Sequence, residues 1–207
     1  MQVEQQPLLD LMKENAMPGI FSPVADERHG LLTALAQQRY VLGLTAFGLT
    51  DDQACSASSV SELSVGGLIR HLDRVERHWM DIVLQRQAPF DPTADWSENF
   101  RFGPGDTLKA VLGEYAETCA ATDAIIDGIA DLDQPVPVPR DSPWFPKEVD
   151  AWSVRWVLLH LITETARHAG HADIIRESID GATGFSIMAA AEHWPVSPWI
   201  TPWTPAD

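Results

Sequence analysis

The feature that most constrains this chain is a long amphipathic segment whose apolar stripe is interrupted by ionisable residues at its centre. Between Ser153 and Gly181, the core-facing positions follow one another at intervals of three and four residues, the period of an α-helix. The stripe is apolar at both ends and polar in the middle: Val154, Val157, Leu161, Glu164, His168, His171 and Ile175. Isolated buried charges cost several kcal/mol. The fold must therefore balance the charge of these side chains with other groups, or leave this part of the stripe in contact with water.

Metal coordination is one such compensation. Glu164 and His168 stand one helical turn apart, so both can direct a ligand atom at the same ion. His71 lies between apolar positions on a second amphipathic segment. A lone histidine on an apolar face is usually a hydrogen-bonded core residue, but carboxylate and imidazole ligands on facing helices are how metal sites are built inside bundles. From spacing alone, a metal site, a buried hydrogen-bond network and surface charges all remain open interpretations.

The remaining histidines are placed less favourably for sharing an ion. His160 precedes His168 by two turns, which puts them roughly 12 Å apart along a helix axis, too far for one ion. His78 continues the line of His71 along its own segment. His29 and His193 have no similarly spaced partner, so we expect surface or structural roles for them.

Hydrophobic periodicity predicts four long helices, at about residues 26–47, 65–86, 107–129 and 154–179. Ser64, Asp106 and Ser153 stand where helix N-caps are expected, and Gly181 stands where the fourth helix should end. Residues 48–52 are expected to break the first helix and to lead into a polar connector. A shorter helix is expected in the tail, at residues 185–192.

The connectors between these helices differ greatly in length, and we find no convincing strand pattern. Residues 135–146 hold five of the 15 prolines, which excludes a helix or a central strand there. We therefore predict an all-α four-helix bundle with long loops, forming a single domain over residues 1–207. Its core is expected at residues 26–181, with an N-terminal arm at residues 1–25 and a Trp/Pro-rich tail at residues 182–207.

Charge and cysteine content narrow the function further. Fourteen basic against 30 acidic residues give a net charge of −16, which disfavours nucleic acid and anionic membrane surfaces as partners. No apolar run is long enough for a membrane span, and the first residues lack a secretory signal. Cys55 and Cys119 have no basic cluster nearby, so we expect ordinary reduced thiols in a cytoplasmic protein.

Two stretches of sequence resemble a known superfamily. GGLIRHLDRVERHWM at residues 66–80 and WVLLHLITETARHAGHADIIRESIDG at residues 156–181 are similar to the DinB/YfiT-like metal-binding four-helix bundles. The similarity is greatest to their actinobacterial branch of mycothiol-dependent transferases, of the maleylpyruvate isomerase type, and it covers residues 26–181. In that type, a histidine of the second helix and a Glu-x-x-x-His pair of the fourth hold the metal.

Carried onto this sequence, the resemblance implies His71, Glu164 and His168 as metal ligands. Many members of the superfamily have histidine at the position of Glu164, so this chain has the His, Glu, His variant of the site. We expect His171 to lie beside the ligands rather than to bind the ion. Trp79, Trp152 and Trp156 are expected to pack the bundle, and Trp144 and Phe145 are candidates for a pocket wall.

Three ligands of N, O and N type suit zinc, with a fourth position for water or substrate, and nickel is the alternative metal. Our leading hypothesis is a transferase in which the ion activates a low-molecular-weight thiol, mycothiol, for attack on a small electrophile. One alternative is a hydrolase with metal-activated water, for which His171, His78 or Glu76 could supply an acid or base. The other is a metal-binding protein without turnover. Whether the chain forms a homodimer is left open.

Overall fold

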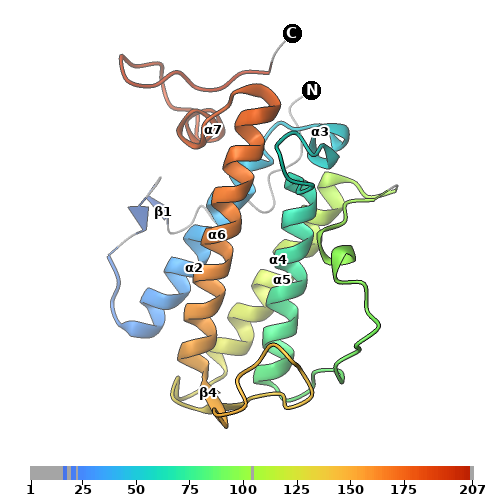
Figure 1. The fold of residues 1–207 in the computed structure, drawn as a ribbon. Helices are drawn as coiled ribbons and strands as arrows, with labels where there is room; N and C mark the ends of the chain where they lie inside the picture. Colours follow the sequence, from blue (N-terminus) through green and yellow to red (C-terminus); the bar gives the residue numbers. More distant parts are fainter. Residues whose placement is uncertain (1–15, 18–19, 22, 104, 206–207) are drawn as a thin grey trace.

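Four long helices form the framework of the residues described by this computed structural model, which are 16–17, 20–21, 23–103 and 105–205 (Figure 1). These helices are α2 (Glu27–Thr45), α4 (Val65–Val83), α5 (Leu108–Asp127) and α6 (Val154–Asp180). Their ends fall within about three residues of the predicted ones, as expected because helix ends fray. The all-α class is confirmed. Most of the predicted N-terminal arm lies outside the described residues.

Side-chain caps fix where the two helices of the candidate site begin. Ser64 accepts a hydrogen bond from the backbone N–H of Gly67 at 3.2 Å, and Ser153 accepts one from Trp156 at 3.2 Å. Each cap satisfies a backbone donor that the first helical turn leaves free. Gly181 ends α6 in the left-handed conformation, with φ of 74°. These starts and this end were readable from the sequence.

The predicted cap of α5 was wrong. Thr107, not Asp106, accepts the hydrogen bond from the N–H of Ala110, at 3.2 Å. The Asp106 carboxylate instead accepts hydrogen bonds from Arg70 of α4 and from the N–H of Gly103, at 2.8 Å. An arginine on a neighbouring helix thus engages the carboxylate, and the cap falls one residue later.

The connectors contain short elements that the sequence analysis missed. Helix α2 does end before residues 48–52, as expected, but the last two of them begin a separate short helix, α3 (Asp51–Cys55), because Asp51 and Asp52 are favourable in a first helical turn. Another connector contains the 3-10 helix η1 (Trp96–Phe100). Two antiparallel pairs also form, β1 (Ala16–Met17) with β2 (Ile20–Phe21), and β3 (Pro135–Pro137) with β4 (Ala151–Ser153). Strands of two or three residues are too short to show a period of two.

The packing order of the helices places α4 opposite α6. Helix α6 packs along α2 and also against α4, and α4 packs against α5 and η1. In Figure 1 the loop joining β3 and β4 lies at one end of the bundle, and α7 (Gly184–Ala191) lies with the tail at the other end. The two helices that carry the candidate ligands therefore face each other between the two ends.

A buried arginine attaches the end of α2 to α6. Arg176 of α6 donates hydrogen bonds to the carbonyls of Thr45 and Phe47, at 2.8 and 2.7 Å, and pairs with Asp180. Its guanidinium also lies 4.7 Å from the centre of the Trp203 ring. Because cations are attracted to aromatic faces, this contact holds the tail on the bundle.

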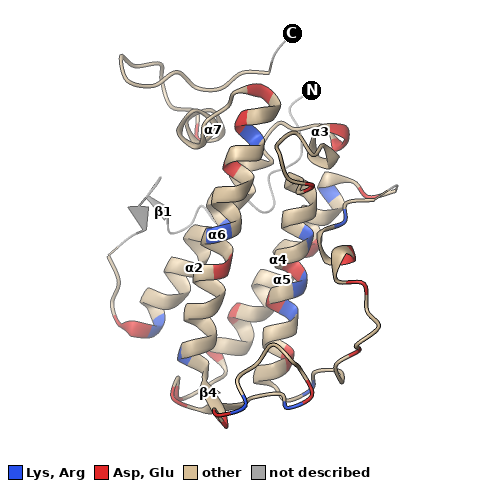
Figure 2. Cartoon of the chain, in the orientation of Figure 1, with Lys and Arg blue, Asp and Glu red and all other residues tan. Residues whose placement is uncertain are grey.

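Charged residues are spread along most of the chain. Figure 2 shows acidic residues on the helices and on the loops, with fewer basic residues among them, consistent with the net charge of −16. Within the described residues, no helix combines the length and the apolar character needed to cross a membrane.

One ion pair lies in the interior, where α2, α4 and α5 meet. Arg39 of α2 and Glu76 of α4 are each only 2% exposed and share two hydrogen bonds, and Arg39 also pairs with Asp123 of α5 at 2.9 Å. Removing one member of a buried pair leaves an uncompensated charge, whereas replacing both by apolar residues is often neutral. Glu76 is thus part of an ion-pair cluster that joins α2, α4 and α5.

Replacing Arg39 alone should therefore destabilise the protein strongly. We expect Arg39→Met to lower the free energy of unfolding by about 3–5 kcal/mol, and the double variant Arg39→Met/Glu76→Leu to recover most of that loss. The matched control is Arg86→Met, since Arg86 is exposed and pairs with the exposed Asp81 at 2.7 Å, and such surface pairs contribute about 1 kcal/mol or less. Denaturant titration measures all three variants, and equal losses for Arg39 and Arg86 would contradict the assignment.

Candidate metal centre

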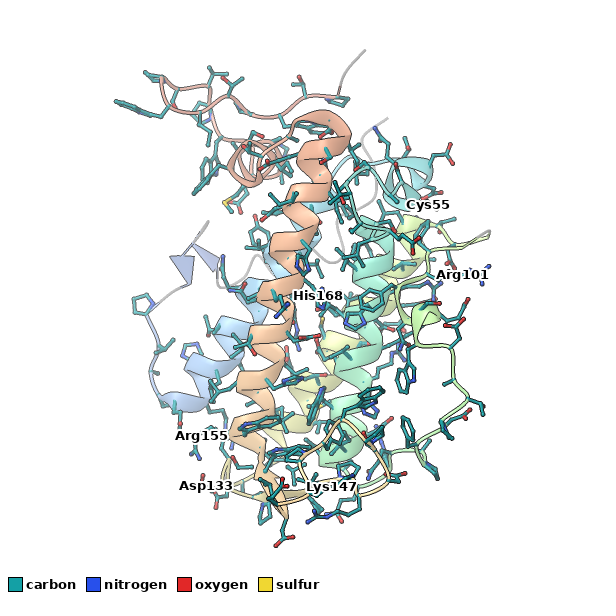
Figure 3. All side chains as sticks on the ribbon, in the orientation of Figure 1. Cys55, Arg101, Asp133, Lys147, Arg155 and His168 are labelled. Atoms are coloured by element: carbon teal, nitrogen blue, oxygen red, sulfur yellow. The ribbon has the colours of Figure 1, made fainter. Side chains whose placement is uncertain are left out.

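The structure brings His71, Glu164 and His168 together between α4 and α6. Each residue offers one ligand atom, and the three atoms lie within 4.8 Å of one another. One Glu164 oxygen, Oε1, is 3.4 Å from His71 Nε2 and 3.2 Å from His168 Nε2. His168 lies near the middle of α6, as Figure 3 shows. Two imidazole nitrogens from different helices are thus directed at the same carboxylate.

The electrostatics favour an ionised carboxylate at this position. Hydrogen bonds from His168 and then from His71 hold the pKa of Glu164 well below its usual range, against the opposing effect of burial. His168 is almost buried, but the Glu164 side chain is 27% exposed. The cluster therefore holds an ionised carboxylate that is partly exposed to solvent.

Phe100 holds His71 in place, and the sequence analysis missed it. The two rings stack with centroids 4.0 Å apart and planes 16° from parallel. Phe100 is the last residue of η1, which packs against α4, so the connector before α5 forms one wall of the site. The aromatic residues of this connector were visible in the sequence, but nothing in their spacing indicated a stacking partner.

His171 lies beside the cluster, as expected. Its Nδ1 is 3.3 Å from Nδ1 of His168, whose other ring nitrogen is directed at Glu164. When one nitrogen of a ligating imidazole binds an ion, the other carries the proton and commonly donates a hydrogen bond that fixes the ring. His171 is thus positioned to accept that bond.

Three other residues that the sequence analysis considered for the site, His160, His78 and Glu76, do not belong to the cluster. His160 stacks on Trp156 and contacts Trp79, outside the three-residue cluster. His78 has its pKa lowered by burial and lies next to Trp79, while Glu76 is bound to Arg39. Glu76 is therefore unavailable as an acid or base for a hydrolase.

Neither cysteine takes part in the cluster. Cys55 is exposed and Cys119 is buried in α5, where burial raises the pKa of its thiol well above the usual value. A thiol with a raised pKa is a poor nucleophile at neutral pH. Both cysteines fit the expected structural role.

The donor set fits a divalent cation. Two imidazole nitrogens and one carboxylate oxygen are the ligand types found in catalytic zinc sites, in which three protein ligands leave a position for water or substrate. The ionised Glu164 between two imidazoles supplies the negative charge that such an ion needs. Metal binding by these three residues nevertheless remains a prediction, and nickel suits imidazole ligands as well.

Fold and site together define a DinB-like helical bundle. A crystal structure described as a conserved protein from Enterococcus faecalis superposes with a TM-score of 0.59 at 17% sequence identity, over 78% of this chain and 100% of that one. At such identity the likeness shows the fold alone. A comparison with curated proteins gave no match.

Residues 30–181 match the family described as mycothiol-S-transferase. This range contains all four long helices except the first turn of α2, together with His71, Glu164 and His168. The chain belongs to the mycothiol S-transferase family.

If these three residues bind one ion, removing His168 should remove most of it. We expect His168→Ala to lose at least roughly 90% of the divalent metal retained by the unchanged protein, because changing a residue that only hydrogen-bonds to a metal ligand already costs tenfold or more in affinity. His29→Ala is the control, since His29 is exposed and accepts only a local hydrogen bond from Ala25. Metal content is measured by elemental analysis, and equal content in both variants would refute the assignment.

Removing the metal should weaken the fold without abolishing it. The bundle has an extensive apolar core that does not depend on the ion, unlike a zinc finger, which unfolds without its metal. After chelation we expect a lower melting temperature with nearly unchanged helical circular dichroism at room temperature. Loss of most of the helical signal would contradict this expectation.

Proposed function

We propose that this protein is a metal-dependent thiol S-transferase that joins mycothiol to a small electrophile. The observation that carries the proposal is the His71, Glu164 and His168 cluster in a chain that belongs to the mycothiol S-transferase family. A divalent ion held by these residues, for which we propose zinc, would lower the pKa of a nearby thiol and so supply a thiolate nucleophile at neutral pH.

The residues of the chain have separate tasks in this reaction. His71, Glu164 and His168 would hold the ion between two helices, and Glu164 would balance part of its charge. His171, whose Nδ1 is 3.3 Å from Nδ1 of His168, would then accept a hydrogen bond from that ring and fix its orientation, and Phe100 fixes His71 by stacking. A rigid ligand set of this kind keeps the sulfur of the thiol in one place, which raises the frequency of productive collisions with the electrophile.

The central test combines metal content and turnover on one purified sample. We expect conjugation of an electrophile to require protein and mycothiol together, and Glu164→Ala to reduce the thiol-dependent rate at least about a hundredfold, by analogy with the loss of other charge-stabilising groups. The rate should reach half its maximum at a pH below the pKa of the free thiol, because a nearby cation favours the thiolate.

A hydrolase would give a different pattern. It would cleave an ester or amide with no thiol present and lose that activity in Glu164→Ala. If mycothiol changes no rate and such hydrolysis is observed, the proposal is wrong. If the protein binds metal but turns over neither kind of substrate, it is a metal-binding protein without catalysis.

A further inference from the structure

A ladder of parallel aromatic rings leads along α6 towards the candidate metal centre. Trp152, Trp156 and His160 follow one another at four-residue intervals, and the next two positions in this series are Glu164 and His168. The Trp152 and Trp156 rings are 4.8 Å apart and 6° from parallel, and the Trp156 and His160 rings are 5.4 Å apart and 4° from parallel. The ladder therefore ends one helical turn from a candidate ligand.

Neighbouring side chains hold the ladder rigid. Trp79 of α4 is almost buried and contacts all three rings, with centroid distances of 5.3 Å to Trp152, 5.5 Å to Trp156 and 4.5 Å to His160. Phe145 closes the far end, 5.0 Å from Trp152 and 5.7 Å from Trp79. Aromatic pairs in these geometries add about 0.5–1.5 kcal/mol each beyond the area that they bury. The ladder thus forms a preformed surface.

Part of this surface is accessible, contrary to the expectation that Trp156 packs inside the bundle. Trp156 is 39% exposed, and Trp144 of the adjoining loop is more exposed still. Among the described residues, neither ring nitrogen of His160 has a hydrogen-bond partner, and the one parallel ring neighbour of His160 is Trp156. Burial lowers the pKa of His160, so an uncharged imidazole continues the surface towards Glu164.

We propose that the ladder of Trp152, Trp156 and His160 binds the electrophile and selects compounds with a planar, conjugated aromatic group. This inference rests on the proposed transferase function. The planar group stacks as the next ring beyond His160, which brings the adjoining reactive carbon to the side of Glu164, where the thiolate forms. The substrate class is therefore aryl-conjugated enones and related acceptors.

The addition is chemically balanced without an oxidant or a reductant. The thiol releases its proton to water, and the thiolate sulfur bonds to the β-carbon of the enone. The π electrons of the carbon–carbon double bond move to the carbonyl oxygen, and a proton from water then completes the saturated ketone. The ladder contributes by holding the conjugated system flat beside the sulfur.

The first arm of the test measures specificity. An aryl enone, 4-phenylbut-3-en-2-one, is compared with an aliphatic enone, pent-3-en-2-one, in kcat/KM with mycothiol. We expect Trp156→Leu to lower kcat/KM for the aryl enone by roughly fivefold or more and for the aliphatic enone less than about twofold, because His160, on which the aryl group stacks, loses the parallel ring that holds its plane. Trp156→Phe retains a ring and should recover most of the loss. Equal losses for both enones would overturn the inference.

The second arm measures binding without metal or thiol, so it also decides the inference if the proposed function fails. An unreactive planar ketone, 2-acetylnaphthalene, is titrated into the metal-stripped full chain, and tryptophan fluorescence is recorded. We expect quenching with a Kd that Trp156→Leu raises at least fivefold. The control is Trp199→Leu, because Trp199 is 90% exposed and lines a separate pocket in the tail. No binding, or a Kd that changes only in the Trp199 variant, would overturn the inference.

Discussion

The arrangement of α4 against α6 depends on the Glu164 carboxylate and on how its charge is compensated. A carboxylate at a seam position of a bundle is unfavourable unless other groups share its charge. His168 does so from one turn away on the same helix, and His71 does so from the opposite helix. The second contact joins α4 to α6. A change in the position of α4 relative to α6 would therefore also change the geometry of the candidate metal centre.

A second cluster of charged side chains is centred on the buried Arg39. Arg39 binds Glu76 and Asp123, which ties α2, α4 and α5 together on the side of α4 away from His71. Glu76 lies only five residues from His71, yet its carboxylate is paired with Arg39 inside the core. The bundle therefore separates a structural ion pair, which is almost fully buried, from the partly exposed carboxylate of Glu164.

The loops complete the site from two directions. The connector before α5 supplies Phe100, which stacks on His71, and the loop before α6 supplies Phe145, which closes the aromatic ladder. The two connectors also touch, since the N–H of Phe90 donates to Asp141 at 2.7 Å. Long connectors cost little extra closure entropy as they lengthen, and here they place aromatic side chains against a rigid helical frame.

Sequence alone determined what depends on neighbours within one or two helical turns. The periodicity gave the four helices, the caps at Ser64 and Ser153 gave two of their starts, and the four-residue spacing put Glu164 beside His168. The family resemblance pointed to His71, but only the tertiary structure decided how far His71 lies from Glu164 and that it stacks on Phe100. The tertiary structure also decided two ion pairs, Glu76 with Arg39 and Asp106 with Arg70. Each of these contacts joins residues 29 or more positions apart. No helical period encodes such contacts, because they arise from how whole helices and loops pack.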